Sequence, residues 1–347
     1  MKLGVFLSHE TACDVAQEAE RLGYGMALVP EGFRSDAPTV LGAVAAHTRR
    51  IALASGVMQV PARTPVMTAL TAATLDGLSG GRFRLGLGVS NPDVSLGWYG
   101  APFNEPLSRL REYVAVVRTA LQGEPVRHSG RHYRLPPEGT EEAAHLAAAP
   151  VRADLPIYLA GVRPGSLRLA AEIADGWVGV FSSPERIARS LTHVREVRGD
   201  LDGFEVVPSV PIAVADDLEQ AADTLRGYYA KFIGLGAKER GIYFALATDM
   251  GFGEDAEEIH ARYAAGDRMG AVRAVPFAFM DRTALIGPVS RIAPRIAEYA
   301  AVGVTTLGLT VLSRTLEGQL AVVRAAAEAT AGMAALADQR AGRSGGE

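Results

Sequence analysis

Two polar side chains able to take part in acid–base chemistry follow the first two apolar runs of the chain. His9 comes just after the run 2–7, and Glu31 comes just after the run 24–29. An imidazole titrates near neutral pH, and a carboxylate can fix a ligand or exchange a proton. In an α/β barrel, active-site side chains gather where strands end. We therefore predict His9 as a proton donor and Glu31 as a second site residue.

The third apolar run contains small residues where Val or Ile would be typical of a strand. Its sequence is ASGVMQ, from Ala54 to Gln59, which indicates either a bulge or unusual peptide, or simply tight packing. Arg63 follows between Pro61 and Pro65. An arginine on such a loop could contact an anion, or it could be a solvated surface residue.

Two glycines mark the fourth run, LGLGVSN. Gly86 and Gly88 lack the third glycine of a dinucleotide-binding fingerprint and lie within a strand, so they are a weak indication of that fold. They favour close approach of a helix or a cofactor. Such an approach places Val89, Ser90 and Asn91 at the end of the strand, in reach of a ligand.

The segment AGVRPGS, from Ala160 to Ser166, leads from a strand into a helix that begins near Pro164. A helix N-terminus presents free N–H groups and favours phosphate, and Arg163 adds positive charge. The same segment could be an ordinary strand-to-helix turn.

Several classes of protein are excluded or disfavoured by composition and spacing. The seven histidines show no metal-ligand spacing, no Gly-x-Ser-x-Gly elbow is present, and Cys13 is the single cysteine in 347 residues, so we predict no metal site, triad or disulfide. A net charge of -4 disfavours nucleic acid as a partner. No apolar run is long enough to span a membrane, and the N-terminus lacks a signal-peptide core. We expect a cytoplasmic protein.

Short apolar runs alternate with amphipathic segments along most of the chain, which predicts strands alternating with helices. The predicted strands are 2–7, 24–29, 51–60, 83–89, 157–160, 176–181, 206–214 and 304–311. The predicted helices are 11–22, 37–48, 64–78, 166–174, 184–198, 218–232 and 288–302. Strands that are apolar throughout are typical of a parallel sheet covered on both faces.

Eight such strands favour a (β/α)8 TIM barrel, with a doubly wound open sheet as the structural alternative. Segments 91–104, 123–155 and 234–281 interrupt the alternation and are interpreted as insertions on the loops that follow the strands, the second with a hairpin at 127–135. We predict one domain over 1–333 and a frayed tail over 334–347.

Five blocks of the sequence together resemble one known family. They are GYGMALVPEGF, ASGVMQVPARTPVMTALTAATLDGLSGGRFRLGLGVS, GWYG with PLSRLREYVAVVR, ADGW, and VGVTTLGLT. They are similar to the bacterial luciferase-like monooxygenase superfamily, in its coenzyme F420-dependent oxidoreductase branch, over nearly the whole chain.

The resemblance implies a (β/α)8 barrel, a homodimer, and a flavin or deazaflavin at the carboxyl ends of the strands. It also implies a non-proline cis peptide, here between Gly56 and Val57. The residues around the ring and its ribityl chain would be Glu31, Gly56, Val57, Gln59, Val89, Ser90 and Asn91. The residues that hold the phosphate would be Ala160, Gly161, Val162, Arg163, Gly165 and Ser166.

Three positions depart from the family pattern. Sugar-phosphate dehydrogenases of this branch place a histidine and a glutamate, as proton-transfer partners, where this chain has Gly32 and Asn91. That dehydrogenase activity is therefore not expected. Many relatives have glycine in place of Arg163, so the grip on the phosphate could be altered.

The leading hypothesis is an oxidoreductase in which reduced F420 passes a hydride from C5 to an unsaturated carbon, an imine or a carbonyl of a small substrate. We predict His9, Glu31 and Asn91 as the catalytic residues: Glu31 would fix the ring, and His9 or a bound water would deliver the proton. Arg63, Trp98 and Tyr99 would line the substrate pocket. The alternatives are an FMN-dependent monooxygenase and a non-catalytic barrel with an altered cofactor site, the latter motivated by Gly32, Asn91 and Arg163.

Overall fold

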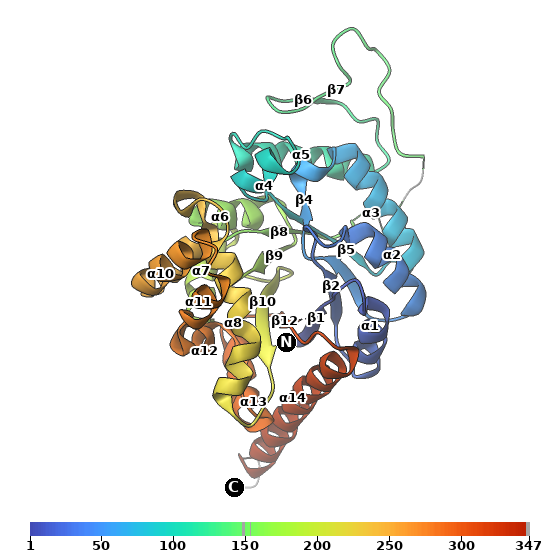
Figure 1. Ribbon diagram of the computed structural model, residues 1–347. Coiled ribbons are helices and arrows are strands. Elements are labelled where there is room, and N and C mark those ends of the chain that lie inside the picture. The colour runs from blue at the N-terminus through green and yellow to red at the C-terminus, as the bar shows by residue number, and fades with distance from the viewer. Residues whose placement is uncertain (148–149, 153, 345–347) are drawn as a thin grey trace.

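Eight parallel strands close into a barrel with helices packed around it (Figure 1). The computed structural model describes residues 1–147, 150–152 and 154–344, with side chains described to residue 331. The barrel strands, in order around it, are β1 (Lys2–Phe6), β2 (Met26–Val29), β3 (Ala52–Ser55) with its continuation β4 (Met58–Gln59), β5 (Phe83–Gly88), β8 (Ile157–Ala160), β9 (Gly176–Gly179), β10 (Glu205–Ala213) and β12 (Thr306–Val311). Pairing of β12 with β1, from Thr306 opposite Lys2, closes the ring. The predicted barrel is confirmed, and the open-sheet alternative is wrong.

All seven predicted helices are present, and further helices follow β5 and β12. Their bounds are α1 (Ala12–Arg21), α2 (Ala37–His47), α3 (Pro65–Ser79), α5 (Pro106–Leu121), α6 (Pro164–Ile173), α7 (Pro184–Arg198), α8 (Leu218–Gly234), α13 (Val289–Ala301) and α14 (Leu316–Ser344). Capping side chains begin several of them: Asp36 accepts from the Thr39 N–H, and Ser183 accepts from the Arg186 N–H. α14 continues through 334–344, where we expected frayed chain, and the alanines of this stretch favour helix; residues 345–347 lie outside the described part.

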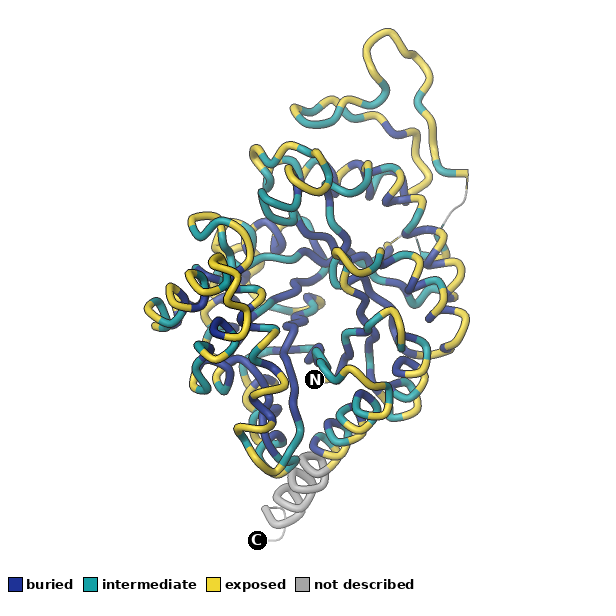
Figure 2. Tube along the Cα trace, in the orientation of Figure 1, coloured by how far each residue is buried: buried dark blue, intermediate teal, exposed yellow. Residues whose placement is uncertain are grey.

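Burial explains why the strands read as continuous apolar runs. Their side chains alternate between the barrel interior and the helix-facing layer, and both are shielded from water (Figure 2). The interior cluster contains Met26, Leu28, Ala52, Ala54, Tyr158, Val178 and Val207, with Phe6 and Val57 partly exposed at its edge.

The third and fourth strands meet at an unusually close contact. The Gly56–Val57 peptide is cis, as the resemblance implied, and separates β3 from β4. The Ser55 hydroxyl donates to the Gly86 carbonyl and accepts from the Gly86 N–H, both at 2.8 Å. A Cβ on Gly86 would lie 2.0 Å from the Ser55 carbonyl oxygen. Position 86 must therefore be glycine because β3 approaches it closely, and not because of a helix or a cofactor.

The three interrupting segments carry structure of their own. Segment 91–104 contains α4 (Pro92–Gly97), and segment 123–155 contains the predicted hairpin, formed by β6 (His128–Ser129) and β7 (Arg134–Leu135). Segment 234–281 contains η2 (Lys238–Arg240) and helices α9 (Ile242–Asp249), α10 (Gly253–Ala264), α11 (Arg268–Arg273) and most of α12 (Phe277–Thr283). These helices share a second apolar cluster with α8 and Phe181, and β11 (Leu285–Ile286) pairs with the end of β10. No described helix is both long and apolar enough to cross a membrane.

The contact between β3 and β5 makes a stability prediction. Gly86→Ala forces its Cβ against the Ser55 backbone and should lower the free energy of unfolding by about 1–3 kcal/mol. Gly227→Ala, inside α8 with nothing within 4 Å of the added Cβ, should raise it by about 0.5–1 kcal/mol. Urea unfolding measures both, and equal effects of the two substitutions would contradict this packing.

Candidate functional site

The Glu31 side chain joins several segments at the carboxyl end of the barrel. It is 3% exposed; Oε1 accepts from the Gln59 N–H at 3.0 Å and from Arg63 Nη1 at 2.7 Å. Oε2 accepts from the Ala37 N–H, at the start of α2, at 3.3 Å. Gln59 Nε2 donates in return to the Glu31 carbonyl at 2.9 Å. The carboxylate therefore holds the ends of β2 and β4 and the start of α2 in one arrangement.

Two further residues extend this network toward the neighbouring strand. The Ser90 hydroxyl donates to Gln59 Oε1 at 2.7 Å, and Ser90 adopts a left-handed φ of 66°. Burial alone would lower the pKa of Arg63, but the bond and charge of Glu31 outweigh it and raise the pKa. The Arg63 guanidinium thus stays charged and is directed at Glu31. The sequence left open whether Arg63 contacts an anion or is a solvated surface residue; here the anion that it contacts is the Glu31 carboxylate.

Tyr99 lies near the same ion pair. Burial, and next the negative charge of Glu31, raise the pKa of its phenol, while Arg63 acts in the opposite direction. The hydroxyl is therefore protonated at neutral pH. Trp98, beside it in sequence, is 61% exposed and packs edge-on against Phe33, with ring centroids 5.1 Å apart. Phe33, from the loop after β2, is a residue that the sequence reasoning missed.

His9 and Asn91 are placed differently from the roles predicted for them. His9 is exposed, and its Nδ1 lies 3.3 Å from Glu10 Oε2, in a surface group with Ser8 and Arg34. It makes none of the recorded contacts with the Glu31 network. The Asn91 side-chain oxygen accepts from the Val94 N–H at 3.0 Å and caps α4. Both catalytic roles remain predictions.

The start of α6 lies directly after β8, as the sequence predicted for a phosphate loop. The Ser166 hydroxyl accepts from the Arg163 N–H at 3.2 Å and donates to the Arg163 carbonyl at 2.8 Å. A Cβ on Gly161 would lie 2.6 Å from Ser166 Oγ, so only glycine allows this turn. The N–H groups of Gly165 and Ser166 lie in the first helical turn, where the helix itself supplies no acceptor.

Arg186 is a second residue that sequence reasoning missed. Its Nη2 donates to the Val162 carbonyl at 3.1 Å, so a cation lies behind the α6 loop. Burial lowers its pKa from the ordinary arginine value. The sequence did offer one indication of this role, because Arg186 comes two residues after Pro184, at the start of the helix α7 that follows β9.

Burial separates the predicted ligand residues from the rest of their strands. Interior strand residues are buried, whereas the residues at the carboxyl ends are partly exposed. The partly exposed set includes Gly56, Val57, Gln59, Val89, Ser90, Asn91, Ala160, Gly161, Val162 and Ser166, while Arg163 and Gly165 are exposed. Glu31 is partly exposed as a residue, but its side chain is buried. The described residues contain no group of three or more metal-binding side chains.

The fold and the site define a class of protein: a parallel (β/α)8 barrel with accessible polar groups at the carboxyl ends of its strands. The chain belongs to the luciferase-like monooxygenase family, which matches residues 7–306. The family and fold predictions are thereby confirmed.

Individual relatives cover nearly the whole chain. A Mycobacterium tuberculosis protein named "Putative coenzyme F420-dependent oxidoreductase" is 34% identical over 329 residues, covering 89% of this chain and 95% of the relative. The 5,10-methylenetetrahydromethanopterin reductase of Archaeoglobus fulgidus is 27% identical and covers 83% of this chain and 85% of the relative. The structure of the coenzyme F420-dependent tetrahydromethanopterin reductase of Methanopyrus kandleri superposes with a TM-score of 0.80 at 23% identity, covering 93% of this chain and 97% of that one.

The Glu31–Arg63 pair should contribute measurably to stability. Because Glu31 is buried and Arg63 is 18% exposed, a double-mutant cycle of Glu31→Gln and Arg63→Met should give a coupling free energy of about 1–3 kcal/mol in urea unfolding. The exposed pair of Glu258 and Arg262, both in α10, is the control and should show a smaller coupling free energy. Equal coupling in the two cycles would argue against a structural role for Glu31.

Proposed function

We propose that this protein is a coenzyme F420-dependent oxidoreductase acting on a small organic substrate. The observation that carries the proposal is the similarity to the mycobacterial relative over 89% of this chain, because the name of that relative includes the activity. The site supports it, because the strand ends offer an accessible surface for a ring and α6 offers free N–H groups for a phosphate. Gly56, Val57 and Gln59 would hold the ring, and Gly165 and Ser166 would hold the phosphate.

The residues fit such a ligand at both ends. At the ring end, Glu31, Gln59 and Ser90 form a hydrogen-bonded chain that fixes polar atoms beside the cis peptide. At the phosphate end, Arg163 and Arg186 flank the α6 loop, so positive charge accompanies the free N–H groups. Arg163 thus strengthens this site in our interpretation instead of blocking it.

When bound, reduced F420 supplies a hydride from C5 for an unsaturated carbon, an imine or a carbonyl. Glu31, already an acceptor from three partners, fixes the position of the ring rather than moving a proton. Trp98 and Phe33 pack edge-on against each other and would offer apolar surface to a substrate.

Tyr99 is the better placed proton source in this proposal. Its phenol is protonated at neutral pH, and it is close enough to Glu31 and Arg63 for both charges to affect its pKa. His9, by contrast, is directed at Glu10 on the surface. Tyr99 could donate its proton directly or through a water, and it replaces His9 in our account of proton delivery.

Anaerobic titration with each cofactor, followed by absorbance, tests the proposal. We expect tight binding of F420, weaker binding of FMN, and a loss of about 10-fold or more in F420 affinity for Glu31→Gln, which removes the charge that organises the ring end. His9→Ala should bind F420 as the wild type does. Preference for FMN would make the protein a flavin-dependent monooxygenase, and failure of the folded protein to bind either cofactor would favour a non-catalytic barrel.

We also propose that the protein is a homodimer joined through α2 and α3. The outer face of these two helices carries Met67, Leu70 and Leu78, which are 51%, 40% and 62% exposed, beside small residues of α2. The only Asp, Glu, Lys or Arg in either helix is Asp76, which is fully buried. An uncharged helical face of this kind is typical of a subunit interface.

Light scattering tests the interface. The wild type should have the mass of two chains, and Leu70→Lys should give monomers because it buries a charge in the interface. Leu235→Lys, at an exposed apolar residue after α8, is the control and should leave the dimer intact. A monomeric wild type, or a dimer that tolerates Leu70→Lys, would contradict the proposal.

A further inference from the structure

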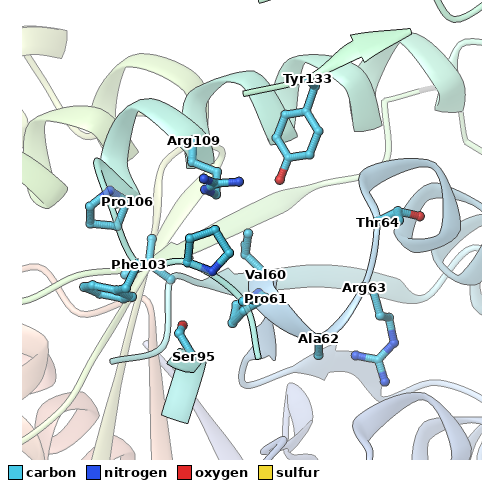
Figure 3. A pocket seen from close by; sticks show the side chains of 13 residues that line it. Val60, Pro61, Ala62, Arg63, Thr64, Ser95, Phe103, Pro106, Arg109 and Tyr133 are labelled. Atoms are coloured by element: carbon cyan, nitrogen blue, oxygen red, sulfur yellow. The ribbon is translucent and has the colours of Figure 1, made fainter. Parts of the chain in front are cut away.

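A half-open cavity of about 290 Å³ lies beside the strand-end site, between the start of α3 and the start of α5 (Figure 3). Its walls come from the loop after β4, from Val89 at the end of β5, from the segment leading into α5, and from the hairpin insertion. The lining residues used below are Val60, Pro61, Ala62, Phe103, Arg109 and Tyr133.

Two arginines line this space: Figure 3 shows the Arg109 guanidinium directed into it, whereas Arg63 is directed away and donates to Glu31. Arg109 Nη2 donates to Asn104 Oδ1 at 3.2 Å, while Arg109 Nε is buried and has no hydrogen-bond partner in the part of the chain that the structure describes. No carboxylate of the described residues lies within ion-pair distance of this guanidinium. A ligand in the cavity does not reach the buried Nε, but a carboxylate there can accept from the Nη groups of the guanidinium that faces the cavity, and hydrogen bonds between two charged groups are the stronger ones.

The carboxylates nearest in sequence are committed to other partners. Glu105 pairs with Arg131 at 2.7 Å and lies 3.6 Å from the His132 ring. Glu112, one turn beyond Arg109, accepts from the backbone N–H groups of residues 131–133 at 2.9–3.0 Å. These bonds anchor the hairpin to α5 and leave the charge of Arg109 uncompensated.

The anchored hairpin places Tyr133 over the cavity. Its ring packs edge-on against Tyr113, and Figure 3 shows its hydroxyl directed into the cavity on the side of Arg109. Burial raises the pKa of this phenol more than the hydrogen bond of Arg109 lowers it, so the hydroxyl remains a donor at neutral pH. Val60, Pro61 and Phe103 line the rest of the space with apolar surface.

We propose that this cavity is a second binding site that takes a small organic carboxylate, with its charged group on Arg109 and Tyr133 and its apolar body against Val60, Pro61 and Phe103. The inference stands on the cavity and does not depend on which cofactor the strand ends bind. Two sources share this chemistry. One is a separate small molecule, and the other is an anionic tail of a ligand held at α6, because Leu107 on α5 lies against Gly165.

Ligand-observed 19F NMR with 4-fluorobenzoate tests the site on the full-length protein. We expect saturable binding in the millimolar range or tighter, and weaker binding of the neutral analogue 4-fluorobenzamide. Arg109→Gln should weaken 4-fluorobenzoate binding by about 10-fold or more. Tyr133→Phe should weaken it less. Arg111→Gln, at an exposed residue of the same helix that pairs with Glu172, is the matched control and should bind as the wild type does.

Ala62→Leu provides a second test that leaves Arg109 in place, because the larger side chain fills the cavity and should abolish binding. Addition of F420 distinguishes the sources: competition identifies the cofactor tail as the occupant, and simultaneous binding identifies a separate small molecule. Absence of saturable binding, equal affinity for the amide, or unchanged binding in Arg109→Gln and Ala62→Leu would overturn the proposal.

Discussion

The buried carboxylate of Glu31 is the interaction on which the arrangement of the candidate site depends. It bonds to β4 through the Gln59 N–H, to the loop after β4 through Arg63, and to the start of α2 through the Ala37 N–H. These segments come from two successive strand–helix units, and no apolar contact could fix their polar ends with the same directionality. Once they are fixed, Gln59 is oriented to accept from Ser90 and carries the arrangement across to β5.

The barrel and the segments that interrupt it contribute different parts of the site. The strand ends and α6 provide backbone groups and small residues, which suit the cofactor that we propose. The loop with α4 brings Trp98 and Tyr99, and the hairpin brings Tyr133 over the adjoining cavity. This division allows the inserted segments to change without disturbing the strand ends.

The strands and the main helices could be predicted because burial on both sides makes each strand a continuous apolar run. The resemblance located the cis peptide at Gly56–Val57. Short helices α9–α12 were not predicted, because each buries its apolar residues only against α8 and its neighbours in the second cluster. Arg186 supports the α6 loop through a contact that is distant in sequence, and only its place two residues after Pro184 indicated it. Asn91 and His9 instead have partners close in sequence: Asn91 caps α4 through the Val94 N–H, and His9 is directed at Glu10. Their position after a strand favoured a catalytic interpretation over these local contacts.

A crystal structure of the protein with bound F420 tests the central claim most directly, through the distances from the phosphate oxygens to the backbone nitrogens of α6. The account predicts hydrogen bonds from the N–H groups of Gly165 and Ser166 to the phosphate, and a ring that lies against Gly56–Val57 within reach of the Glu31–Gln59–Ser90 chain. A phosphate bound away from the start of α6, or a ring outside the carboxyl ends of the strands, would contradict it.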